Sequence, residues 1–282
     1  MGLPRHGFAV TALLAFTSVT FAQSGGAPAD SAPDPVKAIV ARLDLEQYKA
    51  TIKGLTQFGD RRQGTDRNRA AVDWIEAQLK SYGCTNTERI KYEYNGRQLR
   101  NDSTNKVDSA RNAANPTAAR PPAARPRPPA NPPKGYRART GVNIDPNLQP
   151  DTALRRINAQ WDTPGPREEV YCTKIGTTRP NEMYIVGAHM DGHGYGAAAN
   201  DDGSGTALVM ELARILYSPD VKTERSIRFI LFNNEETGGG AAAYVRQRAP
   251  LQGVESPAGS GKYPEPKWLG MIQHDMMLWD HG

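Results

Sequence analysis

Most of the short motifs that identify an enzyme mechanism are missing from this chain. It contains no HExxH zinc motif, and Gly203-Ser204-Gly205 does not form the GxSxG turn of serine hydrolases. Residues 192–196 are rich in glycine, but they lack the GxGxxG spacing of a dinucleotide site and the lysine of a nucleoside triphosphate loop. The sequence therefore gives no support to these four classes of enzyme.

Long apolar segments are lacking too, apart from residues 8–21 near the start. That stretch follows a short basic segment, and it is shorter than the roughly 20 residues that a membrane-spanning helix needs. The small-x-small pattern at its end places a cleavage site after Ala22. We therefore expect residues 1–22 to be a secretory signal peptide and residues 23–282 to form one secreted or periplasmic domain with no membrane partner.

Cysteine is scarce, since Cys84 and Cys172 are the only two in the chain. Both lie in segments that read as strands, and export would permit a disulfide. We expect the two cysteines to pair, and two buried free thiols are the alternative.

Acidic residues are absent from residues 110–140, although this stretch holds seven basic residues and eight prolines. The net charge of +5 comes from this stretch, because the rest of the chain is slightly acidic. Such a segment cannot bury enough apolar surface to offset its ordering entropy, so we expect a disordered insertion over residues 104–165. Only Tyr136 interleaves with the charges. Because one aromatic residue is too few for stacking on single strands, we expect no nucleic-acid partner.

The rest of the chain alternates between strand-like and helical patterns. Apolar residues of 66–82 recur at steps of three and four, with Thr65 as the expected N-cap and Gly83 as the stop. Further helices are expected over residues 35–53, from residue 204, and over 241–248, and strands over 85–94, 168–175, 183–188, 227–232 and 268–272. This order predicts an α/β fold with a mixed, mostly parallel central sheet and helices on both faces. We find no internal repeat.

Three of the predicted strands stop at residue types that bind metals. The first ends at His189, the second runs into Glu235 and Glu236, and the third ends near Asp275. Asp201 lies on a glycine-rich turn between the first two. In open α/β sheets, ligands collect beyond the carboxyl ends of the strands. Carboxylate oxygen and imidazole nitrogen suit divalent cations, so the pattern predicts a hydrolytic metal site.

Two carboxylates beside the expected ligands suit supporting roles. Because Glu235 and Glu236 are adjacent beyond a strand, one can bind metal while the other acts as general base. Asp191 lies two residues after His189, so its carboxylate can accept the second ring N–H of that imidazole and fix its tautomer.

Three further residues near these strands have simpler interpretations. Asp202 follows the expected bridging carboxylate, and we interpret it as a turn or cap residue of the next helix. His193 follows a glycine and precedes a glycine-rich turn, so we interpret it as a loop residue. His274 competes with Asp275, but neighbouring strand residues point oppositely and only one of the two can face a metal.

These segments resemble those of the secreted bimetallic zinc aminopeptidases, metallopeptidase family twenty-eight. The matching pieces are residues 188–191, 199–205, 228–238 and 274–276. The resemblance implies two zinc ions and the ligands His189, Asp201, Glu236 and Asp275. It further implies that Asp201 bridges the ions, that Glu235 is the general base, and that Asp191 orients the imidazole of His189.

The resemblance also implies an activity, since the family removes N-terminal residues from peptides. We therefore expect an exported zinc exopeptidase with peptide substrates. A non-catalytic peptidase-like binding domain, or an amide-processing enzyme such as a glutaminyl cyclase, is the alternative. Family members carry a further histidine late in the domain, and neither this ligand nor the last strands of the sheet can be placed after Asp275. We expect a C-terminally truncated domain, or a partner that supplies the ligand; the oligomeric state stays open.

Overall fold

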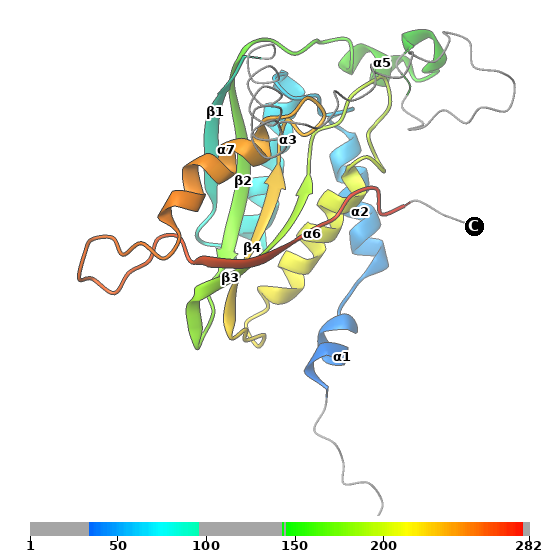
Figure 1. The fold of residues 1–282 in the computed structure, drawn as a ribbon. Helices are drawn as coiled ribbons and strands as arrows, with labels where there is room; N and C mark the ends of the chain where they lie inside the picture. The colour runs from blue at the N-terminus through cyan, green and yellow to red at the C-terminus, as the bar shows by residue number, and fades with distance from the viewer. Residues whose placement is uncertain (1–33, 96–142, 144, 279–282) are drawn as a thin grey trace, which may run out of the picture.

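The computed structural model describes residues 34–95, 143 and 145–278 (Figure 1). The expected signal peptide, residues 1–22, lies outside the described residues. So do residues 104–142 and 144 of the expected insertion.

A mixed sheet of five strands forms the centre of the described chain. The strands are β1 (Glu88–Tyr94), β2 (Gly165–Lys174), β3 (Arg179–His189), β4 (Arg225–Phe232) and β5 (Lys267–Gln273). Their order in the sheet is β1-β2-β4-β3-β5. β3 pairs in parallel with both β4 and β5, whereas β2 runs antiparallel to β4 and β1. Only β2 therefore opposes the common direction, which confirms the predicted mixed, mostly parallel sheet.

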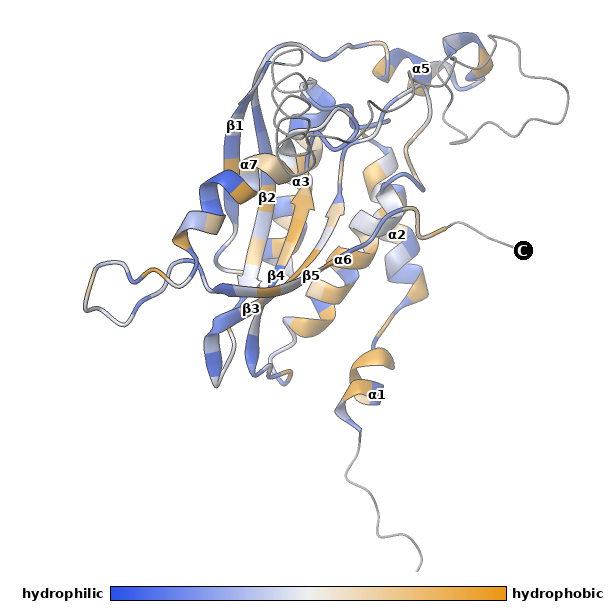
Figure 2. Cartoon of the chain, in the orientation of Figure 1, coloured by the Kyte–Doolittle hydropathy of each residue, from blue (hydrophilic) through white to orange (hydrophobic). Residues whose placement is uncertain are grey.

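Helices cover both faces of this sheet, as predicted. The helices α2 (Leu45–Thr56), α3 (Asp66–Ser81) and α6 (Gly203–Leu216) lie on one face, and α7 (Gly240–Arg248) lies on the other (Figure 1). Figure 2 shows hydrophobic residues along β4 and on α6, where strand and helix meet. Two groups of buried residues result, one between the sheet and α3 and α6, and one between the sheet and α7. None of the described helices is both long enough and apolar enough to cross a membrane.

Local signals in the sequence set the ends of the helices. The Thr65 hydroxyl accepts the backbone N–H of Asn68 at the start of α3, and Gly83 follows its end with φ of +99°. Both features were predicted. The helix expected over residues 35–53 is divided into α1 (Pro35–Val40) and α2, because Asp44 caps a new helix start between them.

The described part of the expected insertion is folded, which contradicts the prediction of disorder for it. Residues 145–165 contain the short 3-10 helix η1 (Pro146–Leu148) and α5 (Thr152–Ile157). Asn158 is buried after α5, where its side chain accepts the backbone N–H of Asp60 (3.0 Å) and donates to the carbonyl of Gly196 (2.6 Å). This part packs against the loop between β3 and α6.

The predicted disulfide is not formed. Cys84 and Cys172 are both free and buried. The thiol of Cys84 is instead within hydrogen-bond range of the Asn86 side-chain oxygen (3.3 Å) and the Tyr217 hydroxyl (3.4 Å). Two buried free thiols were the alternative interpretation, and the structure agrees with it.

The core makes a direct prediction about stability. Leu79 on α3 has no exposed surface, whereas Leu45 at the start of α2 is 62% exposed. Leu79→Ala should lower the free energy of unfolding by about 2–5 kcal/mol because it leaves a cavity. Leu45→Ala should change it by less than about 0.5 kcal/mol. Urea unfolding followed by circular dichroism measures both values, and equal losses would contradict the packing described.

Candidate active site

The candidate site lies at one edge of the sheet, where three parallel strands end. β3 ends at His189, β4 leads into Glu235 and Glu236, and β5 is followed closely by Asp275. Because parallel strands end at the same edge, the residues that follow them come together there. Asp201 reaches this edge from the loop before α6.

His189 is the centre of a cluster of carboxylates. The residue is only 1% exposed. Its Nε2 lies 3.2 Å from Oδ1 of Asp201 and 3.7 Å from Oδ1 of Asp275. Burial lowers the pKa of His189, but nearby carboxylates outweigh this effect. The pKa rises to about 10 because of contact with Asp201 and the charges of Asp191, Asp202 and Glu235. The carboxylates around His189 together carry more negative charge than one protonated imidazole can balance.

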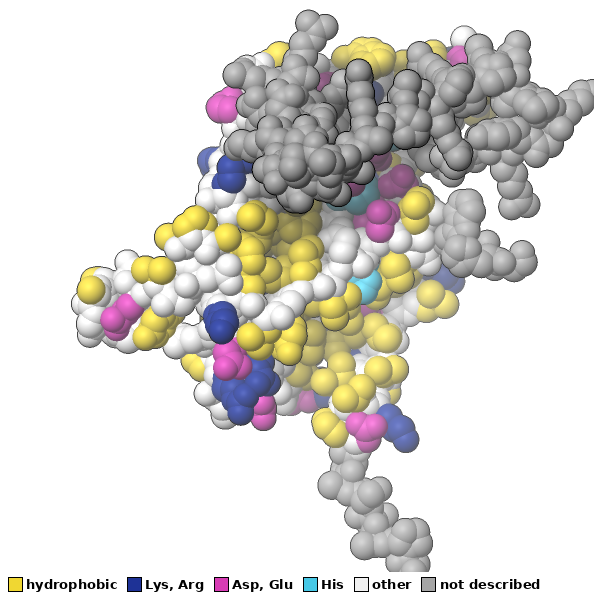
Figure 3. Space-filling model, viewed as in Figure 1, with side chains coloured by type: hydrophobic (Ala, Val, Ile, Leu, Met, Phe, Trp, Pro, Cys, Tyr) yellow, Lys and Arg dark blue, Asp and Glu magenta, His cyan; other side chains and the backbone are white. Residues whose placement is uncertain are grey.

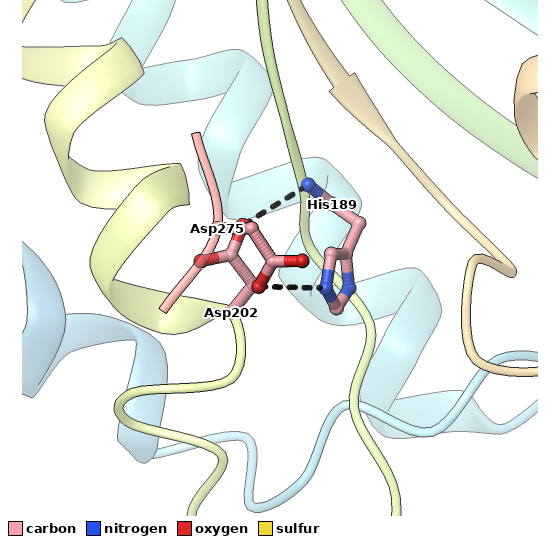
Figure 4. Close-up of side chains that lie close together, drawn as sticks. All are labelled: His189, Asp202 and Asp275. Atoms are coloured by element: carbon pink, nitrogen blue, oxygen red, sulfur yellow. Dashed lines mark hydrogen bonds and ion pairs between the residues drawn. The ribbon is translucent and has the colours of Figure 1, made fainter. Parts of the chain in front are cut away.

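Asp202 completes a compact group with His189 and Asp275, which Figure 4 shows pointing toward one another. One ligand atom from each lies within 4.8 Å of the others, so these three residues form a possible metal-binding group. The oxygens of Asp202, however, already accept backbone N–H groups of Gly205 (2.8 Å), Met276 (3.1 Å) and His189 (3.3 Å). Asp202 is buried and caps α6, as predicted.

Asp191 contacts His189 in a different way from the one predicted. Nδ1 of His189 lies 2.9 Å from the backbone oxygen of Asp191, while the nearer carboxylate oxygen is 3.8 Å away. The carboxylate accepts the backbone N–H of Glu235 instead (3.0 Å). The carbonyl, not the carboxylate, therefore sets the tautomer of the imidazole. The Asp191 carboxylate holds the segment that carries the expected base.

Glu235 and Glu236 face different partners, as predicted for adjacent carboxylates. The Glu235 side chain is 56% exposed, and its Oε2 lies 4.0 Å from Nε2 of His189. Oε2 of Glu236 lies 2.6 Å from Nδ1 of His193. Burial raises the pKa of Glu235; the charge of His189 opposes this, and that of Glu236 adds to it.

One residue that shapes this site, Arg61, was not predicted from the sequence. Arg61 is fully buried, and its guanidinium donates to the backbone carbonyls of Leu55, Gly59, Met190, Ala197 and Ala198. Three of these carbonyls belong to the loop between β3 and α6. Arg61 therefore fixes the loop on which Asp201 lies, and no local pattern marks an arginine for such a role.

An apolar cavity of about 650 Å³ opens beside the carboxylates. Figure 3 shows apolar side chains gathered in a hollow over the sheet, with acidic and histidine side chains at its rim. His189, Glu235 and Asp275 line the cavity together with residues of α7 and β5, among them Tyr244 and Trp268. The rings of Tyr244 and Trp268 stack with centroids 5.2 Å apart. An uncharged side chain bound there would lie next to the carboxylates.

Comparison with known proteins agrees with this geometry. Residues 170–278 match the family model described as Peptidase family M28. Aminopeptidase YwaD of Bacillus subtilis is 43% identical over 67 residues, which cover 23% of this chain and 14% of that protein. Carboxypeptidase Q of Xenopus laevis is 32% identical over 71 residues, which cover 25% of this chain and 15% of that protein. Residues 170–278 thus resemble peptidase family M28, and the matching stretches span only 14% and 15% of the length of these two relatives.

A solved structure shows the same fold. The aminopeptidase from Aneurinibacillus sp. strain AM-1 superposes with a TM-score of 0.51 and 18% sequence identity. The match covers 84% of this chain and 71% of that one. At this identity the likeness establishes the α/β architecture, and the metal-dependent chemistry typical of the family agrees with the possible metal-binding group described above.

A buried carboxylate behind the site makes stability depend on pH. Glu169 on β2 is unexposed, and burial raises its pKa from 4.5 to about 8, with a smaller contribution from the charge of Asp191. Between these pH values the folded chain holds a proton that the unfolded chain has lost, so stability falls as the pH rises toward 8. Glu169→Gln should remove this loss.

At pH 9 the Glu169→Gln variant should be more stable than the wild type by about 1–3 kcal/mol, and at pH 4 the two should be nearly equal. Urea unfolding from pH 4 to pH 9, with a chelator present in every sample, measures the difference. Parallel stability curves for the two proteins would show that Glu169 is not protonated in the folded state.

Proposed function

We propose that the chain is an exported, zinc-dependent exopeptidase that removes N-terminal residues from peptides. The observation that carries the proposal is the convergence of His189, Asp201 and Asp275 beside Glu235, at the mouth of an apolar cavity. The match of residues 170–278 to a peptidase family and the names of the relatives support the same class of reaction.

The residues present fit a metal centre. Imidazole nitrogen and carboxylate oxygen are the ligand types that zinc binds, and the carboxylates around His189 leave negative charge for a cation to balance. His189 and Asp275 would hold one ion and Glu236 the other, with Asp201 between them. Bound zinc supplies Lewis acidity, which lowers the pKa of a water molecule and polarises a carbonyl.

Glu235 is the residue that moves the proton in this proposal. Its carboxylate is accessible, and its backbone is held by the Asp191 carboxylate. A raised pKa brings Glu235 closer to the neutral range in which a general base is most effective. Glu235 takes a proton from the attacking water and donates it to the leaving amine nitrogen as the peptide bond breaks.

The charge of the site supports cleavage at the N-terminus rather than the C-terminus. A free α-ammonium group is attracted to a carboxylate-rich site, whereas a free α-carboxylate is repelled. Two arginines beside the site could otherwise bind an α-carboxylate, but both already have partners. Arg61 is bound to backbone carbonyls, and Arg62 donates to Asp162 (2.8 Å). The apolar cavity suits an uncharged side chain of the residue to be removed.

Substitution of each adjacent glutamate separates the two roles. Glu235→Gln should lower kcat on an amino-acid 4-nitroanilide by about 10²–10⁴-fold, because the general base is lost, while bound zinc is unchanged. Glu236→Gln should lower both activity and zinc content. Steady-state kinetics and metal analysis of the same samples measure these effects. Full turnover by Glu235→Gln would reject Glu235 as the base.

Export of the chain is a separate part of the proposal, and it rests on residues 1–22. If they are a signal peptide, the exported protein begins at Gln23. N-terminal sequencing of protein recovered outside the cytoplasm tests this directly. An exported chain that still begins at Met1 would contradict the cleavage proposed.

A further inference from the structure

Glu265, in the loop before β5, is a buried carboxylate with no part in the metal chemistry proposed above. The residue has no exposed surface. Its Oε1 accepts the indole N–H of Trp268 (2.5 Å) and an N–H of the Arg228 guanidinium (2.6 Å). Among the described residues, its Oε2 has no hydrogen-bond partner. One oxygen of a buried carboxylate therefore joins an indole to a guanidinium.

Arg228 on β4 provides a fixed anchor for this carboxylate. The residue is 2% exposed, and its Nε donates to the Thr173 hydroxyl on β2 (3.0 Å). Its guanidinium carbon lies 4.2 Å from the centre of the Tyr171 ring, which is also on β2. Its Nη1 donates to the hydroxyl of Tyr244 on α7 (2.6 Å) as well as to Glu265. Because these partners come from several elements of the fold, the guanidinium has little freedom to move.

Tyr244 and Trp268 form an aromatic wall of the apolar cavity, and both rings are tied to Arg228. Their planes lie 12° apart and their centroids 5.2 Å apart, which is a stacked arrangement. Tyr244 reaches Nη1 of Arg228 through its hydroxyl, and Trp268 reaches it through Glu265. The same cavity is lined by three members of the carboxylate cluster: His189, Glu235 and Asp275. The aromatic wall is therefore held in place where a bound side chain would lie.

The backbone around Glu265 is restrained as well. Pro264 and Pro266 flank the residue, and the ring of each fixes its own φ angle. The carbonyl of Glu265 accepts the backbone N–H of Gly253 (2.9 Å). A substrate cavity keeps its shape when the residues behind its lining are restrained in this way.

Stability alone gives a weak reason for an ion pair at this position. Two buried charges lose their contact with water, so apolar residues of similar volume often stabilise a protein equally well. Apolar replacements for Arg228 and Glu265 could not, however, accept the indole N–H or donate to the Tyr244 hydroxyl. What the pair adds is the orientation of the two rings.

We propose that Glu265 is a positioning residue that sets the preference of the enzyme for the residue it removes. By joining Trp268 to Arg228, it holds the aromatic wall against a large apolar side chain, such as that of leucine. A small side chain, such as that of alanine, makes fewer contacts with the wall and depends on it less. The inference deepens the proposed function and rests on it, because it needs the cavity to hold the substrate side chain. The competing explanation is an ion pair that only stabilises the loop of residues 252–266.

Kinetics on two substrates separate these explanations. The full chain loaded with zinc is assayed with the 4-nitroanilides of leucine and alanine. Arg228→Met/Glu265→Leu removes the pair but keeps an apolar core, so the fold is retained. Glu265→Gln keeps an acceptor oxygen for the indole, and Trp268→Phe keeps the ion pair but lacks the indole N–H. Glu255→Ala is the matched control, because this glutamate lies in the same loop and accepts the backbone N–H of Gly259 (2.8 Å) instead of an aromatic N–H.

We expect the double variant to raise KM for the leucine substrate by at least about 10-fold, and KM for the alanine substrate by less than about twofold. Its kcat on both substrates should stay close to that of the wild type, because the carboxylate cluster is unchanged. Trp268→Phe should shift KM in the same direction, and Glu265→Gln and Glu255→Ala should match the wild type. Fluorescence of the uncharged dye N-phenyl-1-naphthylamine gives a readout without turnover, and the double variant should bind this dye at least about 10-fold more weakly.

Each other outcome overturns the proposal in a recognisable way. If KM for the leucine substrate is unchanged in the double variant, or in Trp268→Phe should the double variant not fold, the pair only stabilises the loop, and the peptidase function is unaffected. If kcat falls equally on both substrates, the pair does not act through the cavity wall. If Glu265→Gln behaves like the double variant, its acceptor oxygen is not what holds the ring. A wild type that cleaves neither substrate contradicts the proposed function, and equal dye binding by the wild type and the double variant would then contradict this inference too.

Discussion

Parallel pairing of β3 with β4 and with β5 is the constraint on which the candidate site depends. The register places His189 opposite Phe232, so β3 and β4 end at the same level, and it places Gln273 opposite Gly187, so β5 ends two residues earlier at the same edge of the sheet. The residues that follow each strand then meet without any long excursion of the chain. A shift of one residue would turn alternate side chains to the other face of the sheet, which would carry His189 away from the carboxylates.

Electrostatic repulsion between the carboxylates must be offset for this edge to hold its shape. Backbone groups do much of this, because N–H groups of three separate segments bind the Asp202 carboxylate and the Glu235 N–H binds that of Asp191. Buried Arg61 adds a positive charge while its N–H groups bind carbonyls of the loop. The carboxylates nearest to His189 Nε2, Asp201 and Asp275, are only partly covered by such contacts and remain available to a cation.

The sequence predicts those features that are encoded locally. The Thr65 cap, the Gly83 stop and the strands that end at His189 and before Glu235 each depend on neighbouring residues, and each was found. Features that depend on distant contacts were not predicted. The Asn158 side chain accepts a hydrogen bond from Asp60, 98 positions away in the sequence. The composition of residues 145–165 does not reveal this contact, so disorder was wrongly predicted there. Cys172 lies in β2, as expected, but Cys84 lies between α3 and β1, outside any strand, and the sequence does not determine whether their thiols join.

The errors at the site have the same origin. From a spacing of two residues, the Asp191 carboxylate was expected to face the imidazole, but the chain turns after β3 and presents the carbonyl instead. His193 was assigned to a loop because it lies among glycines. The structure confirms the loop, and it also shows that the loop folds back onto Glu236, a contact that spacing does not reveal.

The most direct test of the account is the position of bound zinc in a crystal of the full chain, located by anomalous scattering at the zinc absorption edge. A zinc centre at these strand ends should give a peak within roughly 2.0–2.2 Å of Nε2 of His189 and of carboxylate oxygens from Asp201 and Asp275. Zinc that binds only elsewhere, or a site that stays empty at saturating zinc, would contradict the claim that the strand ends of β3, β4 and β5 form a metal centre.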